Sequence, residues 1–489
     1  MKIIVCMKRL ASGEMNPFDT SALEEALALE PEQITVVSMG AVNTVPLLEE
    51  LTRLGPIDAV LLSDKDFAGA DTLATSLTLA EWLKTQDYDL IICGRQSIDG
   101  ETAQVGPELA QLLGLEICIR VLAVRQTGEK TGSTCRQSGG IRDKATKLLC
   151  ATRDGVRQME LPAVLTMERS GVLRFPSLWA QKKPVTVLNR EMLGLKRENC
   201  GSLGSPTQVL ETRENQSGRR NCQMIAPGEL PEIMRNLGNP EGAQGKERGR
   251  TFAGDCDEKL REVWITDDIL REEANNIAEK VTLVTVALIE EFCNNVRERQ
   301  PEVILFPADW ESRTVAPQLA AALRTGLCAD CTALLVEDGE LHMVRPAQGG
   351  NLLAKIRCKT KPVMATVRTA AEISKTLVFA VGKGALEQKQ EIIKLAETYH
   401  ACMAASKASV ELGEFPYECQ VGLTGKSISP RIYVAFGISG AIHHIVGMEH
   451  SQTIISVNSD PEAAIFKYAD YGVVSSVAEV LKVLELPGM

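Results

Sequence analysis

The sequence has few aromatic residues and no long apolar segment. Phe, Trp and Tyr make up 4% of its 489 residues, which suits the Ala, Leu and β-branched packing of α/β layers. No run of about eighteen apolar residues is present, so the sequence predicts no transmembrane helix. The N-terminus, MKIIVCMKRL, lacks the apolar core of a signal peptide. We therefore expect no integral membrane segment and a cytoplasmic location.

The sequence also lacks an excess of basic residues. Its net charge is −11 and its pI is about 5.3, whereas a nucleic-acid-binding domain normally has a basic face. We therefore expect no nucleic-acid partner. The length of the chain predicts about three domains.

A disulfide framework is not indicated either. The fourteen cysteines are scattered singly along the chain, and only residues 328–331 form a C-x-x-C motif. Because no second pair of Cys or His lies near this motif, two reduced thiols are favoured over zinc or redox chemistry. No acid–base pair, nucleophile triad or metal cluster is visible, so we predict no catalytic residue and no metal site.

The first part of the chain alternates apolar runs with helical patterns. Strands are predicted at residues 2–7, 34–39, 59–62 and 89–93, and helices at 22–29, 45–54 and 72–82. Such alternation indicates a parallel sheet with right-handed crossovers. Short strands and turns from 120 to 169 indicate an antiparallel extension.

A glycine-containing loop, residues 94–107 (GRQSIDGETAQVGP), follows the fourth predicted strand. Gly100 and Gly106 give the backbone freedom, and Thr102 supplies a hydroxyl. The helix that follows offers free N–H groups to a phosphate. The loop has neither the Walker A pattern nor the G-x-G-x-x-G fingerprint. It predicts a nucleotide site, with a purely structural loop as the alternative.

The middle of the chain is predicted to contain a linker and a smaller domain. Residues 211–261 are rich in Gly, Asn and charged residues, as flexible connections are. The alternative for residues 231–237 is a short helix, because proline is tolerated at the first helical position. Beyond them, strands predicted at 263–266 and 303–306 flank one long helix, predicted at 268–299.

The C-terminal block, residues 420–472, has apolar runs at 431–435 and 453–457 that are typical of buried parallel strands. Gly437, Ser439 and Gly440 follow the first run and precede a helix predicted at 441–446. Such a turn lets the backbone approach an anionic ligand at the carboxyl end of a sheet. The alternative is an ordinary strand-to-helix turn.

These motifs together resemble the electron-transfer flavoprotein family. Residues 1–210 are similar to a β subunit in VCMKR at 5–9, FAGADT at 67–72, RFPS at 174–177 and the 94–107 loop. The C-terminal block is similar to the FAD-binding domain of an α subunit in VGLTGK, GISGAIHH and DPEAAIFKYADYG. The chain is therefore identified as a natural fusion of a β subunit with a shortened α subunit.

The resemblance implies an α/β fold. Two adenine-nucleotide-binding-like parallel-sheet domains, the second truncated, are followed by a C-terminal doubly wound FAD-binding domain. The expected boundaries are 1–210 for the β-like domain with its C-terminal arm, 211–261 for the linker, 262–370 for the shortened first α domain and 376–489 for the FAD-binding domain.

Two cofactor sites are implied. The first holds FAD in the C-terminal domain, at Lys383, Ser406, Lys407, Val421, Gly422, Leu423, Thr424, Ser439, Gly440, Ala441, Ile442, His443, His444 and Asn458. The second holds FAD or AMP in the β-like half, at Cys6, Asn16, Met39, Asp99, Gly100, Glu101, Thr102, Ala103, Gln104, Val105 and Gly106. By resemblance, Thr424 bonds the flavin N5 edge and His444 stabilises negative charge near O2 and N1.

Four positions depart from the family pattern. Lys383 and Lys407 stand where the family has arginine, Leu423 where it has glutamine, and Ser476 where it has aspartate. Lysine keeps the charge but loses the planar fork of arginine, and the leucine removes a hydrogen bond worth about 1 kcal/mol. We expect FAD to bind with a shifted reduction potential.

The implied function is electron transfer through FAD between partner flavoenzymes. DGETAQVGP at 99–107 is similar to the DGDTAQVGP of electron-bifurcating members, so a second FAD and NADH as donor are expected, with NADH oxidation only beside a partner dehydrogenase. The expected partners are an acyl-CoA dehydrogenase-like or other flavoprotein dehydrogenase, ferredoxin or flavodoxin, and a quinone oxidoreductase. The alternatives are a carrier with one FAD and AMP, and a non-redox adenine-nucleotide-binding scaffold.

Overall fold

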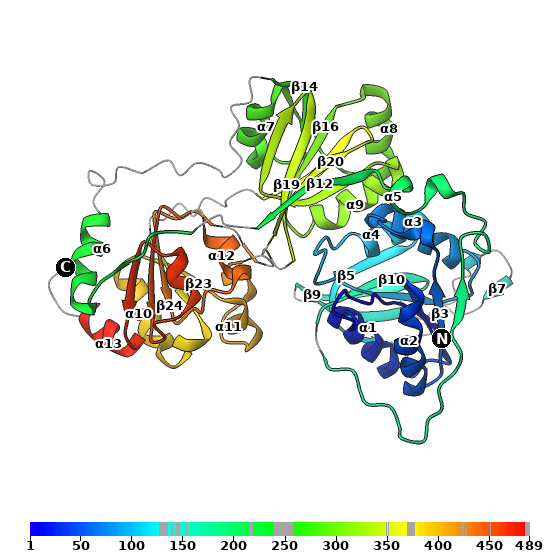
Figure 1. The fold of residues 1–489 in the computed structure, drawn as a ribbon, viewed down its shortest axis with the longest axis horizontal. Helices are drawn as coiled ribbons and strands as arrows, with labels where there is room; N and C mark the ends of the chain where they lie inside the picture. Colours follow the sequence, from blue (N-terminus) through cyan, green and yellow to red (C-terminus); the bar gives the residue numbers. More distant parts are fainter. Residues whose placement is uncertain are drawn as a thin grey trace. The chain divides into compact units, whose positions relative to one another are not determined.

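The computed structural model describes residues 1–126, 147–152, 154–169, 171–214, 219–238, 258–348, 350, 352–368, 377–422, 425–426, 428–449 and 451–484, and the backbone of 135–137 and 140–142. These residues form two compact units, one within 1–212, 256–348 and 354–367 and the other within 213–255, 349–353 and 368–489. Figure 1 shows the helices and strands of both units.

The first unit begins with a nine-stranded sheet. Its order is β11 (Thr186–Leu188), β3 (Ile57–Leu62), β2 (Gln33–Met39), β1 (Lys2–Cys6), β4 (Leu90–Gly94), β10 (Ala163–Met167), β5 (Glu116–Gln126), β8 (Lys147–Thr152) and β9 (Gly155–Glu160). Neighbours from β11 to β5 are parallel, and β8 and β9 extend the sheet in antiparallel fashion. The winding reverses between β2 and β4, on the two sides of β1. Open α/β sheets bind ligands at such a point.

Helices cover both faces of this sheet (Figure 1). In β1, Ile3 and Val5 pack in the core with α1 (Pro17–Ala28) and α2 (Val45–Leu51). Ile4 and Cys6 face the opposite core, with α3 (Thr72–Leu83) and α4 (Val105–Leu113). Because both faces are buried, the central strands are apolar throughout rather than alternating in polarity.

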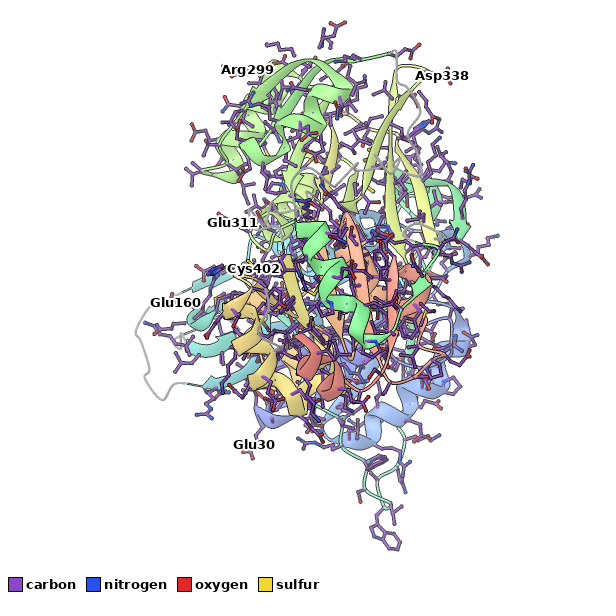
Figure 2. The ribbon with its side chains drawn as sticks, turned by 90° about the vertical axis from the view of Figure 1, so that its left-hand side faces the viewer. Glu30, Glu160, Arg299, Glu311, Asp338 and Cys402 are labelled. Atoms are coloured by element: carbon purple, nitrogen blue, oxygen red, sulfur yellow. The ribbon has the colours of Figure 1, made fainter. Side chains whose placement is uncertain are left out.

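Two further sheets complete the first unit. A parallel sheet has the order β15 (Ala278–Leu283), β14 (Leu260–Ile265), β16 (Val303–Pro307), β21 (Val363–Val367) and β17 (Leu327–Cys331). A four-stranded sheet has the order β12 (Thr207–Glu214), β20 (Leu352–Cys358), β19 (Glu340–Ala347) and β18 (Ala333–Glu337). Figure 2 labels Asp338, in the turn between β18 and β19, and Arg299, at the end of α8 (Ile289–Arg299).

The single helix predicted at 268–299 is wrong. The structure has α7 (Arg271–Ile277), then strand β15, then α8 (Ile289–Arg299). β15 pairs in parallel with β14 at the edge of the sheet. Val281, Thr282 and Val284 favour an extended chain, and this edge position decides in favour of the strand. Helix α9 (Ser312–Leu323) packs with α8 in the adjoining core.

The second unit contains one parallel sheet with helices on both faces. Its order is β13 (Gln223–Met224), β26 (Tyr471–Val474), β25 (Thr453–Asn458), β24 (Ile432–Phe436), β22 (Leu377–Val381) and β23 (Cys402–Ala405). One face packs against α6 (Leu230–Gly238), α10 (Lys389–Thr398), α11 (Lys407–Glu411) and α13 (Val477–Leu484), and the other against α12 (Ile442–Met448). The predicted α/β fold class, with several parallel sheets, is confirmed.

Part of the predicted linker is folded onto the second unit. Strand β13 pairs with β26, and Leu230 and Met234 of α6 are buried in the same core as α10 and α13. Arg220 donates to Asp470 and to the Glu449 carbonyl oxygen. The alternative of a short helix at 231–237 is therefore confirmed as α6, whereas its packing on the second unit was not predicted, because only a few apolar residues anchor it.

No helix in the described ranges is long and apolar enough to cross a bilayer.

The folded part of the predicted linker can be tested with Leu230→Ala, since the Leu230 side chain is fully buried. We expect the free energy of unfolding of the second unit to fall by about 2–5 kcal/mol, because apolar contacts are lost and a cavity remains. Urea denaturation followed by circular dichroism measures this change. Asn236→Ala, on the exposed side of the same helix, is the control and should change stability by less than about 0.5 kcal/mol. Equal unfolding curves for L230A and wild type would contradict the packing.

Candidate functional site

A cavity of about 1030 Å³ lies at the carboxyl ends of β1, β2, β3 and β4. Its wall is formed by the loops that follow these strands and by the start of α4. Leu327, Cys328, Ala329 and Arg345, from β17 and β19, close one side. The volume lies at the upper end of the roughly 300–1,000 Å³ that ligand sites occupy.

The 94–107 loop is held tightly against the sheet. A Cβ atom at Gly94 would lie 2.2 Å from Asp19 Oδ1, and one at Gly106 would lie 2.4 Å from Thr166 Cγ2. Glu101 and Ala103 adopt left-handed φ angles of 53° and 56°. Such conformations are costly for residues with side chains and persist only where the surroundings fix them, often at ligand sites.

Most of the residues predicted for this site line the cavity. They are Cys6, Asn16, Met39, Gly100, Thr102, Ala103, Gln104, Val105 and Gly106. Asp99 and Glu101 lie outside the lining. The Asp99 carboxylate instead accepts hydrogen bonds from Lys8 Nζ and from the Gly100 N–H, both at 2.8 Å.

Asp19 is buried at the floor of the cavity. Its carboxylate accepts the Lys8 N–H at 2.7 Å and the Gly94 N–H at 3.2 Å. Burial raises its pKa to about 7, and the hydrogen bonds from Lys8, Asn16 and Gly94 offset only part of this increase. Because Lys8 follows β1 and Gly94 ends β4, Asp19 joins the two strands at the point where the winding reverses.

A buried network ties the start of α4 to α3. Thr72 Oγ1 lies 2.6 Å from Gln104 Oε1 and 3.1 Å from Glu108 Oε1, and Ser76 donates to Glu108 at 2.7 Å. Burial raises the pKa of Glu108 to about 8. The single proton of the Thr72 hydroxyl serves only one of its two contacts. The protonated carboxyl of Glu108 can therefore donate the other.

Residues from the neighbouring sheets hold the loop from its other side. Arg345 donates through Nη2 to the Gly100 carbonyl oxygen at 2.8 Å. Gln104 donates through Nε2 to the Leu327 carbonyl oxygen at 3.1 Å. Sequence reasoning missed Arg345, because a contact between residues 245 positions apart leaves no local pattern.

A cluster of arginines around Trp310 fixes the base of the loop. The guanidinium groups of Arg95, Arg120 and Arg313 lie 5.3, 4.3 and 4.8 Å from its ring centre. Arg95 also forms a buried ion pair with Glu168 at 2.9 Å. Desolvated cation–π contacts of this kind contribute up to about 2 kcal/mol each. The cluster thereby holds Arg95, which lines the cavity, in one position.

The second unit presents its own set of glycine turns at the carboxyl end of its sheet. A Cβ atom at Gly382 would lie 2.3 Å from the Gly437 carbonyl oxygen, and one at Gly440, whose φ is 89°, would lie 2.1 Å from the Ile465 nitrogen. Backbone therefore packs directly on backbone in the turns after β22 and β24. Such turns let a ligand approach main-chain N–H groups.

The residues predicted for the C-terminal site gather around these turns. Lys383, Lys407, Ser439, Ala441 and His443 are exposed, Ser406, Ile442 and Asn458 are partly buried, and Val421, Gly422, Gly440 and His444 are buried. Ser406 caps α11, and Asn458 Nδ2 donates to the Ile438 carbonyl oxygen at 2.9 Å. Leu423 and Thr424 lie outside the described residues.

His444 is turned toward the interior of the second unit. Its Nε2 atom lies 2.8 Å from the hydroxyl of the buried Tyr433. Burial lowers its pKa to about 4, an effect that the backbone of Val421 partly offsets. Within the described residues, no hydrogen bond of normal length and angle reaches its Nδ1 atom. Tyr433 therefore engages one ring nitrogen of the neutral His444, and the other is buried beside the Val421 backbone.

The arrangement fits a nucleotide cofactor in each unit. The first unit has a large cavity beside a strained loop, and the second has closely packed glycine turns near the buried imidazole of His444. The described residues contain no group of His, Cys, Asp and Glu suited to a metal ion.

Comparison with known proteins gives a family for both units. Residues 4–191 and 254–400 match the family described as "Electron transfer flavoprotein domain". Residues 373–449 match the "Electron transfer flavoprotein FAD-binding domain".

Relatives named as α and β subunits both match the chain. An "Electron transfer flavoprotein subunit alpha" of Thermoanaerobacterium thermosaccharolyticum is 38% identical over 234 residues, which cover 38% of this chain and 71% of that protein. The "Electron transfer flavoprotein subunit beta" of the same organism is 34% identical, over 46% of this chain and 84% of that protein. "Lactate dehydrogenase (NAD(+),ferredoxin) subunit LctC" of Acetobacterium woodii is 33% identical, over 40% of this chain and 56% of that protein.

The buried carboxyl of Glu108 predicts a pH dependence of stability. The folded chain holds the proton of this group up to about pH 8, whereas the unfolded chain releases it near 4.5. The stabilisation is therefore complete below the unfolded pKa and is lost as the pH rises through the folded pKa. Glu108→Gln, which cannot ionise, should make the decline less steep, by at most about 1.4 kcal/mol per pH unit.

Urea unfolding at several pH values measures this slope. Glu116→Gln, at an exposed position of β5, is the control and should keep the slope of the wild type. A slope unchanged in E108Q would contradict a protonated Glu108.

Proposed function

The chain belongs to the electron transfer flavoprotein family, in which it joins β-like and α-like regions, and we propose that it carries electrons between partner flavoenzymes through FAD held in its C-terminal unit. When bound, FAD supplies the redox chemistry, and the protein supplies binding, orientation and electrostatics. The observation that carries this proposal is the set of glycine turns around His444, within the segment that matches the FAD-binding domain.

The residues of the second unit have distinct tasks in this proposal. The turns at Gly382 and Gly440 bring backbone close to the pyrophosphate and ribityl chain. Lys383 and Lys407 place positive charge beside it, although Lys407 also pairs with Glu411 at 3.6 Å. His444, whose pKa burial lowers to about 4, would place a neutral imidazole near an electronegative edge of the flavin ring. The bond from Thr424 to N5 stays a prediction.

The finer proposal is an NADH-dependent electron-bifurcating carrier with a second FAD in the cavity of the first unit. Two observations favour it over AMP. The cavity, at about 1030 Å³, exceeds what a mononucleotide needs, and the loop reads DGETAQVGP. The printed name of the Acetobacterium woodii relative includes NAD(+) and ferredoxin, which are a pyridine nucleotide and a low-potential carrier of the kinds that this proposal requires.

An exposed apolar loop supports the expected partner surface. Phe175, Leu178 and Trp179 are 94%, 89% and 91% exposed in an extended loop (Figure 1). The loop is nevertheless anchored, because Arg53 donates to the Ala180 carbonyl oxygen at 3.0 Å. Exposed apolar patches on a fixed support mark protein-interaction sites. We propose that a flavoprotein dehydrogenase, of the acyl-CoA dehydrogenase type, docks there.

The cofactor content of the denatured full chain, separated by chromatography, tests the two-site proposal. We expect two FAD per chain. One FAD with one AMP would establish the simpler carrier in its place, and a chain without flavin would establish a non-redox scaffold.

Gly440→Ala assigns one FAD to the C-terminal unit. Its Cβ would meet the Ile465 nitrogen in a left-handed turn, so this variant should lose one FAD per chain and keep the nucleotide of the first unit. Gly228→Ala adds a Cβ that meets nothing within 4 Å and should keep both. Full flavin content in G440A would contradict the assignment.

The docking loop is tested with the double variant Leu178→Ala and Trp179→Ala. We expect the concentration of the chain that half-saturates a purified acyl-CoA dehydrogenase to rise at least about tenfold, since buried aromatic anchors dominate interface energies. The flavin content should not change. Val156→Ala removes an exposed apolar side chain of β9 and should leave electron transfer unaltered. Wild-type kinetics in the double variant would exclude this loop.

A further inference from the structure

Cys328 and Cys331, the C-x-x-C motif, lie on one face of strand β17. Cys328 pairs with Ala365 and Cys331 with Val367 of β21, so three steps along β17 match two along β21. The extra residue is accommodated by a bulge in which Asp330 has a φ of 58°. Since successive strand residues face opposite sides, the extra residue turns both cysteines to the same side. Both pack in the same core.

The bulge brings the two cysteines within reach of a disulfide. The two cysteines lie opposite Ala365 and Val367, which are two strand steps, about 6.6 Å, apart along β21. Disulfides join Cα atoms roughly 4.4–6.8 Å apart, so the spacing of the cysteines falls within this range. The Cys331 sulfur already lies 3.5 Å from the Cys328 carbonyl oxygen. Closing the bond therefore requires rotation of side chains rather than rearrangement of strands.

The two thiols differ in their access to the cavity. Cys328 lines the cavity, whereas Cys331 is fully buried behind it and does not. The hydrogen bond from Cys331 lowers the pKa of Cys328, and the positive charge of Arg345 acts in the same direction against burial. Burial and the same bond raise the pKa of Cys331. Cys328 is 2% exposed but borders the cavity, and a thiol with a lowered pKa at a cavity wall, backed by a second thiol, is an arrangement that supports thiol–disulfide exchange.

We propose that Cys328 and Cys331 form a dithiol–disulfide couple that opens on the cavity through Cys328 and takes small-molecule disulfides as its co-reactant. The Cys328 thiolate attacks one sulfur of RS–SR, forms a mixed disulfide and releases RS⁻. The Cys331 sulfur then attacks the Cys328 sulfur, closes the internal disulfide and releases the second RS⁻. The protein loses two electrons and two protons, and two RSH form. The couple needs no flavin and goes beyond the electron-carrier function.

The protein contains a matched pair of thiols outside the cavity. Cys118 and Cys150 are both fully buried, lie in the same core and do not line the cavity. Cys6 and Cys93 are register partners on β1 and β4 and do line it. Oxidation of Cys118 and Cys150 would show that the reagent reaches cysteines through general unfolding. Oxidation of Cys6 and Cys93 would show that the reagent enters the cavity.

The test exposes the full-length chain, as purified and under native conditions, to bis(2-hydroxyethyl) disulfide. After quenching with an alkylating reagent, peptide mass mapping follows each cysteine. We expect the peptide with Cys328 and Cys331 to lose two hydrogen masses and to resist alkylation. Its oxidation should be at least about tenfold faster than that of Cys118 and Cys150, because Cys328 borders the cavity and the control pair does not.

Two variants separate the roles of the thiols. Cys331→Ala should hold the reagent as a lasting adduct on Cys328, because no second thiol displaces it. Cys328→Ala should leave Cys331 unmodified. The proposal is overturned if both thiols of the wild type remain alkylable, if the Cys118–Cys150 pair oxidises equally fast, or if Cys6 bridges Cys93 in place of the proposed bond. The wild-type mapping decides the question even if a variant does not fold.

Discussion

The parallel pairing of β1 with β4 is the constraint on which the first site depends. Ile3 to Cys6 run in register with Leu90 to Cys93, and β2 lies on the other side of β1. The crossovers leave β1 and β4 in opposite directions, so the loops that follow them diverge and leave a cavity between them. Asp19 accepts hydrogen bonds from the backbone of Lys8, just beyond β1, and of Gly94, the last residue of β4. Burying the Asp19 carboxyl costs free energy, because burial disfavours its charged form. The raised pKa of Asp19 reflects this cost.

The cavity also depends on contacts between distant regions of the same polypeptide. Arg345 binds the loop at Gly100, and Gln104 binds Leu327, so residues in the β-like region contact residues far along the chain. The relatives that match the two regions have names of separate subunits. Joining such regions covalently makes their association intramolecular, which raises its effective concentration without any new contact. Residues 219–238 are therefore more than a connection, since they also complete the sheet and one core of the second unit.

Sequence reasoning succeeded where the signal was local. The strand predicted at 34–39 corresponds to Gln33–Met39, and the one at 453–457 to Thr453–Asn458, because buried parallel strands are continuous apolar runs between turns. It failed where a neighbouring element decided the outcome. The 268–299 segment is interrupted by an edge strand. The short helix in the predicted linker packs its few apolar residues into the core of the second unit, which its own composition does not indicate.

The sequence by itself determined the family, the parallel sheets and the 94–107 loop, because each rests on a contiguous run of residues. The tertiary structure decided the protonated state of Glu108, the contact from Arg345 and the shared face of Cys328 and Cys331. Each of these depends on burial or on register between distant strands. Folding brings such groups together only when the whole unit packs. The spacing of residues along the chain therefore does not show which groups become buried in a low-dielectric interior or where a strand forms a bulge.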